Sequence, residues 1–349
     1  MIDNFSAASY NTTLRVVCLD VMLTVRSFRN EDPPRLLELW RHTQCCRNEF
    51  SPLFPLSLNQ LQVQILGLPM LDHQSVMLAF EDDTLVGYVH TMFAPTPDGY
   101  SLDYTTGQIC FLCVDSTCFN TSDVAAALIR AGENYLLRQG AQTIFGGSPS
   151  PSVPFYSALY SGGEAVGILH ADEIAINAFH KANYQIHQAT TWFHFNLQNY
   201  TPVATAETVG YYGTIEVEIS EISKAKTWWE GCTLANGIWL DATAFWIQTG
   251  RPVARLRTRI TYPDTENFLT MYGRNWLASL MELRVHPDFE NMDIKRYLLG
   301  ELIRYLATQH QITHVEAHLT ADSPLFALLR NQSWLERDSG SIFIKTVGK

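Results

Sequence analysis

A long internal repeat constrains this chain more than any other feature of its sequence. The first half contains Phe111-Leu-Cys-Val114, followed by Asp123 and Leu128-Ile129, and the second half contains Glu282-Leu-Arg-Val285, followed by Asp293 and Leu298-Leu299. The predicted order of strands and helices repeats in the same way. A unit of roughly 150 residues is much longer than the repeats of solenoid proteins. The repeat therefore predicts two copies of one domain.

Length and composition agree with two globular domains. The chain has 349 residues, more than a single hydrophobic core usually organises. Hydrophobic residues make up 46% of the chain and charged residues 17%, which excludes a disordered protein or a coiled coil. The formal net charge is −11. Because such a chain repels anionic surfaces, we expect neither nucleic acid nor a membrane as a partner.

The distribution of basic residues restricts how the first half can bind an anion. No Lys or Arg occurs between Arg47 and Arg130. An anionic ligand of this stretch must therefore bind to backbone N–H groups and to the N-terminal ends of helices.

Cysteine content and the N-terminal sequence predict a cytoplasmic protein. Seven cysteines are an odd number in a long chain, which indicates reduced thiols and not a disulfide framework. The sequence begins Met-Ile-Asp-Asn-Phe, without a basic start, and no apolar run approaches about 18 residues. We expect neither an export signal nor a membrane span.

Hydrophobic periodicity and turn residues predict the same series of elements in both halves. In the first half, strands are predicted at 21–29, 75–80, 85–93, 107–114, 143–145 and 190–196, and helices at 30–44, 58–66, 122–139 and 172–182. In the second half, strands are predicted at 214–222, 244–247, 253–260, 277–285, 313–319 and 341–347, and helices at 224–234, 294–309 and 324–332. These elements divide the chain into a loose extension (1–20), a first domain (21–198), a linker (199–213) and a second domain (214–349).

Four segments carry a resemblance to a known family. Val114–Ile129 and Val285–Leu299 are each predicted to lead from a strand into a helix, Asp172–Tyr184 is predicted to contain a short helix, and Phe155–Gly163 precedes it. They resemble segments of the GNAT superfamily of acyl-CoA-dependent N-acetyltransferases, the first three its central strand, pyrophosphate turn and short helix. The resemblance covers both halves and implies an α/β fold of two tandem GNAT-like domains. Each domain is then a mixed, mostly antiparallel (α+β) sheet with helices on both faces.

The resemblance also implies a site for acetyl-CoA as co-substrate. A helix N-terminus offers unpaired N–H groups and a partial positive charge to a pyrophosphate. In the first copy, the implied cofactor-binding residues are Leu112, Cys113, Val114, Asn120, Ser122, Asp123, Val124 and Ala125. Both copies have an Asp where the family has its first glycine, and a helix-capping or first-turn acid is the ordinary structural explanation.

The first copy is the expected acyl-CoA site of the two. It has small side chains at Ser122 and Ala125, whereas the second copy adds Glu290 and Lys295 at its turn. Backbone donors need steric access to the phosphates, so the smaller side chains favour the first copy. The opposite assignment stays open, because one copy of a tandem member is typically degenerate.

Amine acetylation requires a base for the ammonium proton, donors for the oxyanion and an acid for the thiolate. The acidic Tyr that the family places on its short helix is replaced by Phe179 and Leu329, which cannot donate a proton. Tyr156 and Tyr160 are therefore candidate acids or acceptor-pocket residues, and Glu282 is a candidate base. The structural alternatives are packing aromatics for the tyrosines and a solvated carboxylate for Glu282.

No metal site is expected. His314, Glu316 and His318 alternate along one face of a predicted strand, which is a spacing that zinc ligands can have. The residues between them are apolar, so an ordinary two-sided strand explains the pattern as well.

Two functional hypotheses follow from these observations. The first is an acyl-CoA-dependent N-acetyltransferase that transfers an acetyl group to the amine of a small molecule or peptide. The second is a binding or assembly protein that keeps the GNAT fold while its phosphate turns have degenerated. A homo-oligomer is compatible with either hypothesis. Fold alone does not decide between them.

Overall fold

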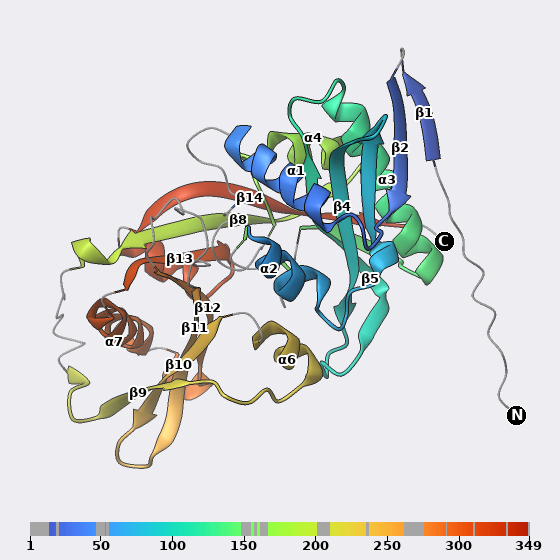
Figure 1. Cartoon of the computed structure of the whole chain (residues 1–349). Coiled ribbons are helices and arrows are strands. Elements are labelled where there is room, and N and C mark those ends of the chain that lie inside the picture. The colour runs from blue at the N-terminus through green and yellow to red at the C-terminus, as the bar shows by residue number, and fades with distance from the viewer. Residues whose placement is uncertain are drawn as a thin grey trace, which may run out of the picture.

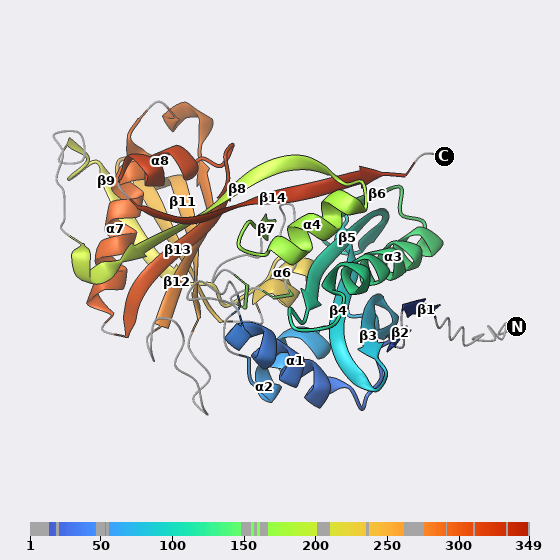
Figure 2. The same cartoon turned by 90° about the horizontal axis from the view of Figure 1, so that it is seen from above.

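The computed structural model describes residues 14–18, 21–46, 53, 56–147, 155–156, 159–160, 167–200, 210–234, 237–261, 276–290, 292–309, 311–332 and 334–347. Fourteen strands form one continuous, mostly antiparallel sheet with helices on both faces (Figures 1 and 2). The predicted mixed α/β architecture is confirmed. The two halves share this one sheet, which the repeat alone did not predict.

The first half follows the predicted order with longer strands. Its strands are β1 (Leu14–Cys18), β2 (Val21–Ser27), β3 (Val76–Glu81), β4 (Thr84–Pro95), β5 (Leu102–Val114), β6 (Thr143–Gly146), β7 (Ile168–Leu169) and β8 (Gln185–Asn196). Its helices are α1 (Pro33–Cys46), α2 (Leu58–Leu61), which continues as a π-turn over Gln62–Leu66, α3 (Thr121–Gln139) and α4 (Glu173–Lys181). Part of the segment predicted to be loose forms β1, which pairs with β2.

The second half repeats this order. Its strands are β9 (Ile215–Glu221), β10 (Ile238–Trp246), β11 (Arg251–Thr261), β12 (Trp276–Val285), β13 (Ile312–Thr320) and β14 (Leu335–Thr346). Its helices are α6 (Trp228–Leu234), α7 (Ile294–Thr308) and α8 (Phe326–Asn331). Both β10 and β14 begin six residues before their predicted starts. Most of the predicted linker, 201–209, lies outside the described residues, so the domain boundaries stay a prediction.

Helix α3 shows why the sequence forms a helix next to the central strands. The Asn120 side chain accepts a hydrogen bond from the Asp123 N–H and caps the N-terminus. Gly140 ends the helix with a φ of 111°, a left-handed conformation that favours glycine. Between these caps, the helix buries an apolar stripe that includes Val124, Leu128 and Leu136. Helix α3 thereby packs on β4 and β5.

The two halves are joined by an exchange of their last strands. The sheet order is β6-β14-β8-β13, so the C-terminal strand β14 lies beside the first half, and β8 lies beside β13 of the second half. Figure 2 shows β8 and β14 crossing the molecule side by side. Phe343 of β14 is fully buried in the core of the first half, where it stacks on Phe179 at 5.3 Å. Neither half can complete its core without the other.

Three hydrophobic clusters cover the faces of the sheet. One lies under α3 and α4, one under α7 and α8, and one under α1 and α2. Trp229 and Cys232 of α6 belong to the cluster under α1 and α2, although α6 follows the linker in the sequence. None of the helices described is long and apolar enough to cross a membrane.

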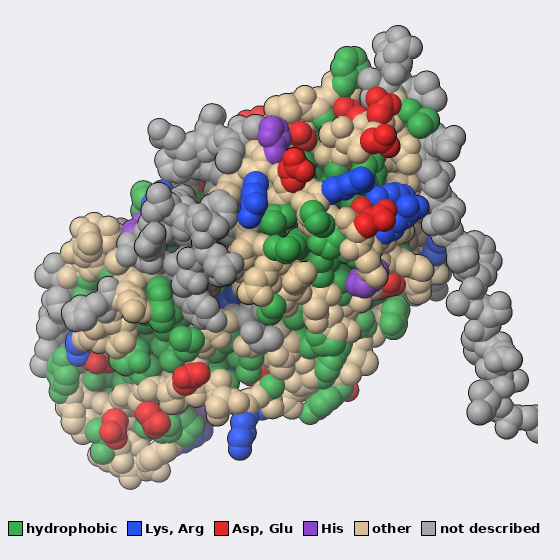
Figure 3. Space-filling model, in the orientation of Figure 1, with side chains coloured by type: hydrophobic (Ala, Val, Ile, Leu, Met, Phe, Trp, Pro, Cys, Tyr) green, Lys and Arg blue, Asp and Glu red, His purple; other side chains and the backbone are tan. Residues whose placement is uncertain are grey.

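Charged side chains are distributed in small groups over the visible surface. On the face in Figure 3, the basic side chains of the described residues are scattered among acidic and other side chains and form no broad basic area. This distribution agrees with the net charge of −11.

Candidate functional site

The central parallel strands of the first half separate part-way along their length. Strands β5 and β6 pair from Thr106–Ile109 to Thr143–Gly146, and Cys110–Val114 extends beyond this pairing. The separation begins at a β-bulge. His90 pairs with Phe111 and Thr91 pairs with Ile109, which leaves Cys110 as the extra residue. A bulge bends its strand and increases the local twist, which directs β5 away from β6.

The second half has the same separation at the equivalent residue. Arg257 pairs with Glu282 and Thr258 pairs with Leu280, so Met281 is the extra residue. Strands β12 and β13 pair only from Trp276 to Ser279 on β12. The two bulges give the same alignment of the halves as the sequence repeat. Cys110 is equivalent to Met281, and Phe111 is equivalent to Glu282.

The separated strand offers backbone hydrogen-bonding groups to the gap. The Asp115 N–H donates to the Val86 carbonyl at 2.8 Å, and the equivalent His286 N–H donates to Val253 at 2.8 Å. The direction of the backbone N–H and C=O groups alternates along a strand. Those of Phe111 and Cys113 therefore point to β4, whereas those of Leu112 and Val114 point to the gap. An extended chain lying in the gap can pair with them as a further strand does.

The N-terminus of α3 lies directly after this strand. The Asn120 amide nitrogen also donates to the Asp123 carboxylate at 2.6 Å, so Asp123 is held in the helix cap. The side chains of Val124 and Ala125 are each 1% exposed and pack into the core below the helix. The backbone of the first turn is thereby left as the surface that the helix end presents.

A cation from α4 lies beside this helix end. The Lys181 ammonium donates to the Ser122 hydroxyl at 2.8 Å. Sequence analysis did not identify Lys181, because 59 residues separate it from Ser122 and only the packing of α4 on α3 brings the two together. Its place in the last turn of α4 was the one available signal.

Tyr156 is buried behind the bulge and does not line an open pocket. Its side chain is 2% exposed, and its ring stacks on Phe111 with the centroids 4.3 Å apart. The Tyr156 hydroxyl lies 3.0 Å from His90 Nδ1. Tyr156 has a φ of 60°, which is uncommon for a bulky residue and is typical of constrained functional positions.

Tyr160 has a structural contact. It is 4% exposed, and its hydroxyl accepts a hydrogen bond from the Leu169 N–H at 2.8 Å. This bond fixes the chain next to β7. The two tyrosines therefore share the cluster under α1 and α2 but bond to different partners.

His90 and Tyr88 extend the environment of Tyr156. Burial lowers the pKa of His90 to about 3, so the imidazole is neutral. Burial raises the pKa of the Tyr156 and Tyr88 hydroxyls well above their usual value, so both stay protonated. A Tyr88 O–H that donates to Tyr156 and a Tyr156 O–H that donates to His90 Nδ1 form a consistent chain. The sequence did not single out His90, whose signal was a histidine within the apolar run 85–93.

Glu282 lies in a network of ion pairs. One carboxylate oxygen accepts from Arg255 at 3.0 Å and the other from Arg284 at 2.6 Å. The side chain is 38% exposed. A substrate ammonium must therefore compete with two guanidinium groups for this carboxylate.

The two positions of the expected family acid are in the core. Phe179 and Leu329 are both 0% exposed. The Phe179 ring lies against Gly146 of β6, where an added Cβ would overlap the ring. Nothing at these positions can protonate a thiolate.

The alternating histidines of β13 have contacts within the sheet. Glu316 lies opposite His194 of β8, and His318 Nε2 is 3.0 Å from the Thr190 hydroxyl. Over the described residues, no group of three or more His, Cys, Asp or Glu side chains has the arrangement of a metal site.

Solved structures with this arrangement exist, although sequence comparison finds none. No family model and no curated protein sequence matches the chain. A tandem GNAT protein from the clavulanic acid biosynthesis pathway is 12% identical and has a TM-score of 0.63, over 94% of this chain and 99% of that one. A GCN5-related N-acetyltransferase from Sphaerobacter thermophilus is 13% identical and has a TM-score of 0.58, over 93% and 95%. An N-myristoyltransferase from Saccharomyces cerevisiae is 9% identical and has a TM-score of 0.56, over 96% and 80%.

These similarities define the class of fold. The chain has the GNAT fold in its tandem arrangement, as the sequence resemblance predicted. At these identities the comparisons establish the fold alone.

Proposed function

We propose that this protein is an acyl-CoA-dependent N-acyltransferase that transfers an acetyl group to the amine of a small molecule or peptide. The observation that carries the proposal is the gap between β5 and β6, which opens at the Cys110 bulge and ends at the N-terminus of α3. Backbone amides in such a gap can bind the pantetheine arm, and the helix end can bind the pyrophosphate. One structural neighbour is described with bound myristoyl-CoA.

The first half is the proposed cofactor site. Lys181 supplies the positive charge that the sequence between Arg47 and Arg130 lacks. Leu112, Cys113 and Val114 supply the strand edge, and Asn120, Ser122, Asp123, Val124 and Ala125 supply the helix end. The exposed Asp123 carboxylate opposes an anion, whereas Lys181 offsets it at the same helix end.

Tyr156 is the proposed acid. The amine nitrogen forms a bond to the thioester carbonyl carbon, the C–S bond breaks, and the departing thiolate takes a proton from the Tyr156 hydroxyl. As the amide forms, the attacking nitrogen loses its remaining extra proton, and that proton restores the Tyr156 hydroxyl. The ammonium proton of the acceptor passes to water, because the first half has Phe111 at the position that Glu282 holds in the second half. Glu282 is the corresponding candidate base of the second half.

A second function is favoured by one observation. The expected acid positions Phe179 and Leu329 are buried hydrocarbons, as in a protein that has lost catalysis. The alternative is therefore a binding or assembly protein with the GNAT fold. A thiol-release assay with acetyl-CoA and a panel of primary amines separates the two functions. Amine-dependent release of free CoA supports the transferase. If acetyl-CoA binds to the protein but no free CoA is released, the result supports the alternative.

A further inference from the structure

A pocket lies at the junction of the two halves. Its volume is about 470 Å³, within the range of small-molecule sites. The β4–β5 hairpin of the first half forms one wall at Pro95–Gly99, and α6 and strands β10–β12 form the others. Eight residues of β5 at about 3.3 Å each separate the hairpin from Cys110, a distance of about 25 Å. The pocket is therefore distinct from the proposed cofactor site of the first half.

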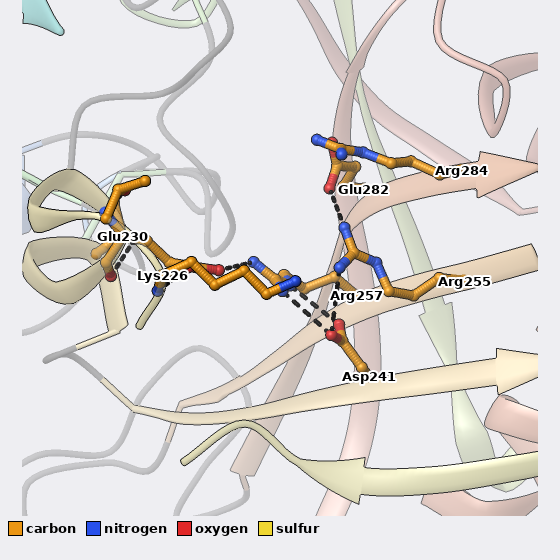
Figure 4. A network of polar contacts seen from close by, with 9 residues as sticks. Lys226, Glu230, Asp241, Arg255, Arg257, Glu282 and Arg284 are labelled. Carbon is orange, nitrogen blue, oxygen red and sulfur yellow. Dashed lines mark hydrogen bonds and ion pairs between the residues drawn. The ribbon is translucent and has the colours of Figure 1, made fainter. Parts of the chain in front are cut away.

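The pocket lies on a face of the second half whose equivalent in the first half is filled by side chains. In the shared register, Arg255 corresponds to Tyr88, Arg257 to His90, and Glu282 to Phe111. Aromatic side chains fill this face in the first half. In the second half, three arginines and three carboxylates form a network from α6 to β12 (Figure 4).

Every carboxylate oxygen of this network already accepts a hydrogen bond. Glu230 accepts from Arg257 (2.8 Å) and the Lys226 N–H (2.6 Å), and Asp241 accepts from Arg257 at both oxygens (3.0 and 3.1 Å). Glu282 accepts from Arg255 (3.0 Å) and Arg284 (2.6 Å). A guanidinium has five N–H groups, so Arg255 and Arg284 keep donors that these bonds do not use. The network therefore has N–H donors to spare, whereas each of its carboxylate oxygens already accepts a hydrogen bond.

Lys226 and Arg284 are the accessible cations of the pocket. Arg284 is 68% exposed and pairs only with Glu282 in the part of the chain that the structure describes. The backbone of Lys226 bonds to Glu230 and to the Tyr100 hydroxyl, whereas no described acidic side chain pairs with its ammonium. Both side chains can turn toward an anion in the pocket.

The charge balance disfavours a dianion. Four cations, Lys226, Arg255, Arg257 and Arg284, face the three network carboxylates and Asp98. Asp98 is held in the hairpin by the Thr96 hydroxyl (2.6 Å) and the Tyr100 N–H (3.1 Å). The set is neutral overall, so a dianion adds more uncompensated charge than a carboxylate does. Apolar surface from Trp229, Trp239 and the hairpin prolines suits an aromatic or aliphatic body.

We propose that this pocket binds a small monocarboxylate with an apolar body, its carboxylate on Arg284 and Lys226 and its body against Trp229. The site is additional to acyl transfer and does not depend on it. Binding bridges the β4–β5 hairpin and the second half.

Calorimetric titration of the full chain with phenylacetate tests the proposal. Phenylacetamide has the same shape without the charge and isolates the role of the carboxylate. Phenyl phosphate tests the preference for a monoanion. We expect phenylacetate to bind at least about tenfold more tightly than either analogue, because charge-assisted hydrogen bonds are the strong ones. No heat with phenylacetate at millimolar concentration, or equal binding of the amide, overturns the proposal. Tighter binding of the phosphate overturns the monoanion preference.

Two variants locate the site. Arg284→Gln and Lys226→Gln should each weaken phenylacetate binding about tenfold. Both side chains are exposed, so circular dichroism should show the folded protein. Arg330→Gln is the matched control, since Arg330 is 59% exposed and pairs with one carboxylate, Glu336, on the second half. Unchanged affinity in both pocket variants, or an equal loss in the control, refutes this location.

Discussion

Phe111 and Glu282 occupy equivalent positions in the two halves. Each follows the extra residue of a bulge, and each pairs with the neighbouring strand, at His90 and Arg257 respectively. The backbone is thus repeated while the chemistry differs. The first half has a buried aromatic and tyrosine–histidine cluster behind the bulge, and the second has a charged pocket. Our proposals place acyl transfer in the first half and small-molecule binding in the second.

The exchange of β8 and β14 predicts that the halves unfold together. Phe343→Ala removes a fully buried ring of β14 from the core of the first half and should cost about 3–5 kcal/mol of unfolding free energy. Urea unfolding followed by circular dichroism and by tryptophan fluorescence should give coincident curves for both proteins. Ile247→Ala, at an exposed turn position, is the control and should change stability little. Two separate transitions in the wild type contradict this account.

Lys181→Gln should weaken acetyl-CoA binding by about three- to tenfold at low salt. The substitution removes the cation beside Ser122 but no buried group, so stability should be nearly unchanged. Calorimetry at two ionic strengths measures the effect, and high salt should reduce the difference between the proteins. Arg138→Gln, at the opposite end of α3, should bind normally. Equal affinities of Lys181→Gln and the wild type at low salt contradict the role of Lys181.

Tyr156→Phe should separate catalysis from binding. Loss of the hydroxyl should lower kcat for thiol release by about a hundredfold and leave acetyl-CoA affinity unchanged, since the acid acts only on the departing thiolate. The lost hydrogen bond to His90 should cost about 1 kcal/mol of stability. Tyr160→Phe is the comparison, because the Tyr160 hydroxyl accepts from the Leu169 backbone N–H. Similar kcat values for the two variants argue against Tyr156 as the acid.

Buried neutral histidines predict a loss of stability in mild acid. The pKa values of His90, His194 and His318 are all lowered to about 3, chiefly by burial. The unfolded chain, with histidine pKa values near 6.5, binds more protons below that pH, so stability is complete above about pH 6.5 and decreases as the pH falls toward 3. Thermal unfolding between pH 7.5 and 5.5 measures this slope before carboxylates titrate. His318→Gln should have a shallower slope, and a flat wild-type profile contradicts the prediction.

Local patterns predicted most of the elements, and failures occurred where a partner is distant in sequence. The strand β10 was predicted to begin at Ala244, and the missed residues before it include the charged Asp241. In the structure, Asp241 bonds to Arg257 on the next strand, so the carboxylate is compatible with a strand. Residues 336–340 of β14 are charged, Ser or Gly and were missed for a similar reason, and their pairing with β8 contains a register shift between Glu336 and Asp338.

The residues of the proposed site also fall into two groups, those that a local pattern predicted and those whose positions depend on distant packing. The helix end at Asn120–Ala125 follows from a local capping pattern and was predicted. Lys181 and His90 were not, because their places depend on how α4 and β4 pack against residues far away in the chain. The buried state of Tyr156 also depends on tertiary packing, as its ring lies against Trp40 and Phe111.

The most direct test is calorimetric titration with acetyl-CoA of the wild type and of variants at the two helix ends. The account predicts that the wild type binds, that Ser122→Glu and Ala125→Glu abolish binding, and that Lys295→Glu at the start of α7 binds as the wild type does. Ser122 is partly exposed in the first turn of α3, where an acidic side chain does not destabilise the helix, so this variant should stay folded if Ala125→Glu does not. No binding by the wild type at millimolar acetyl-CoA, or full affinity in Ser122→Glu, would contradict the assignment of acyl-CoA to the first half.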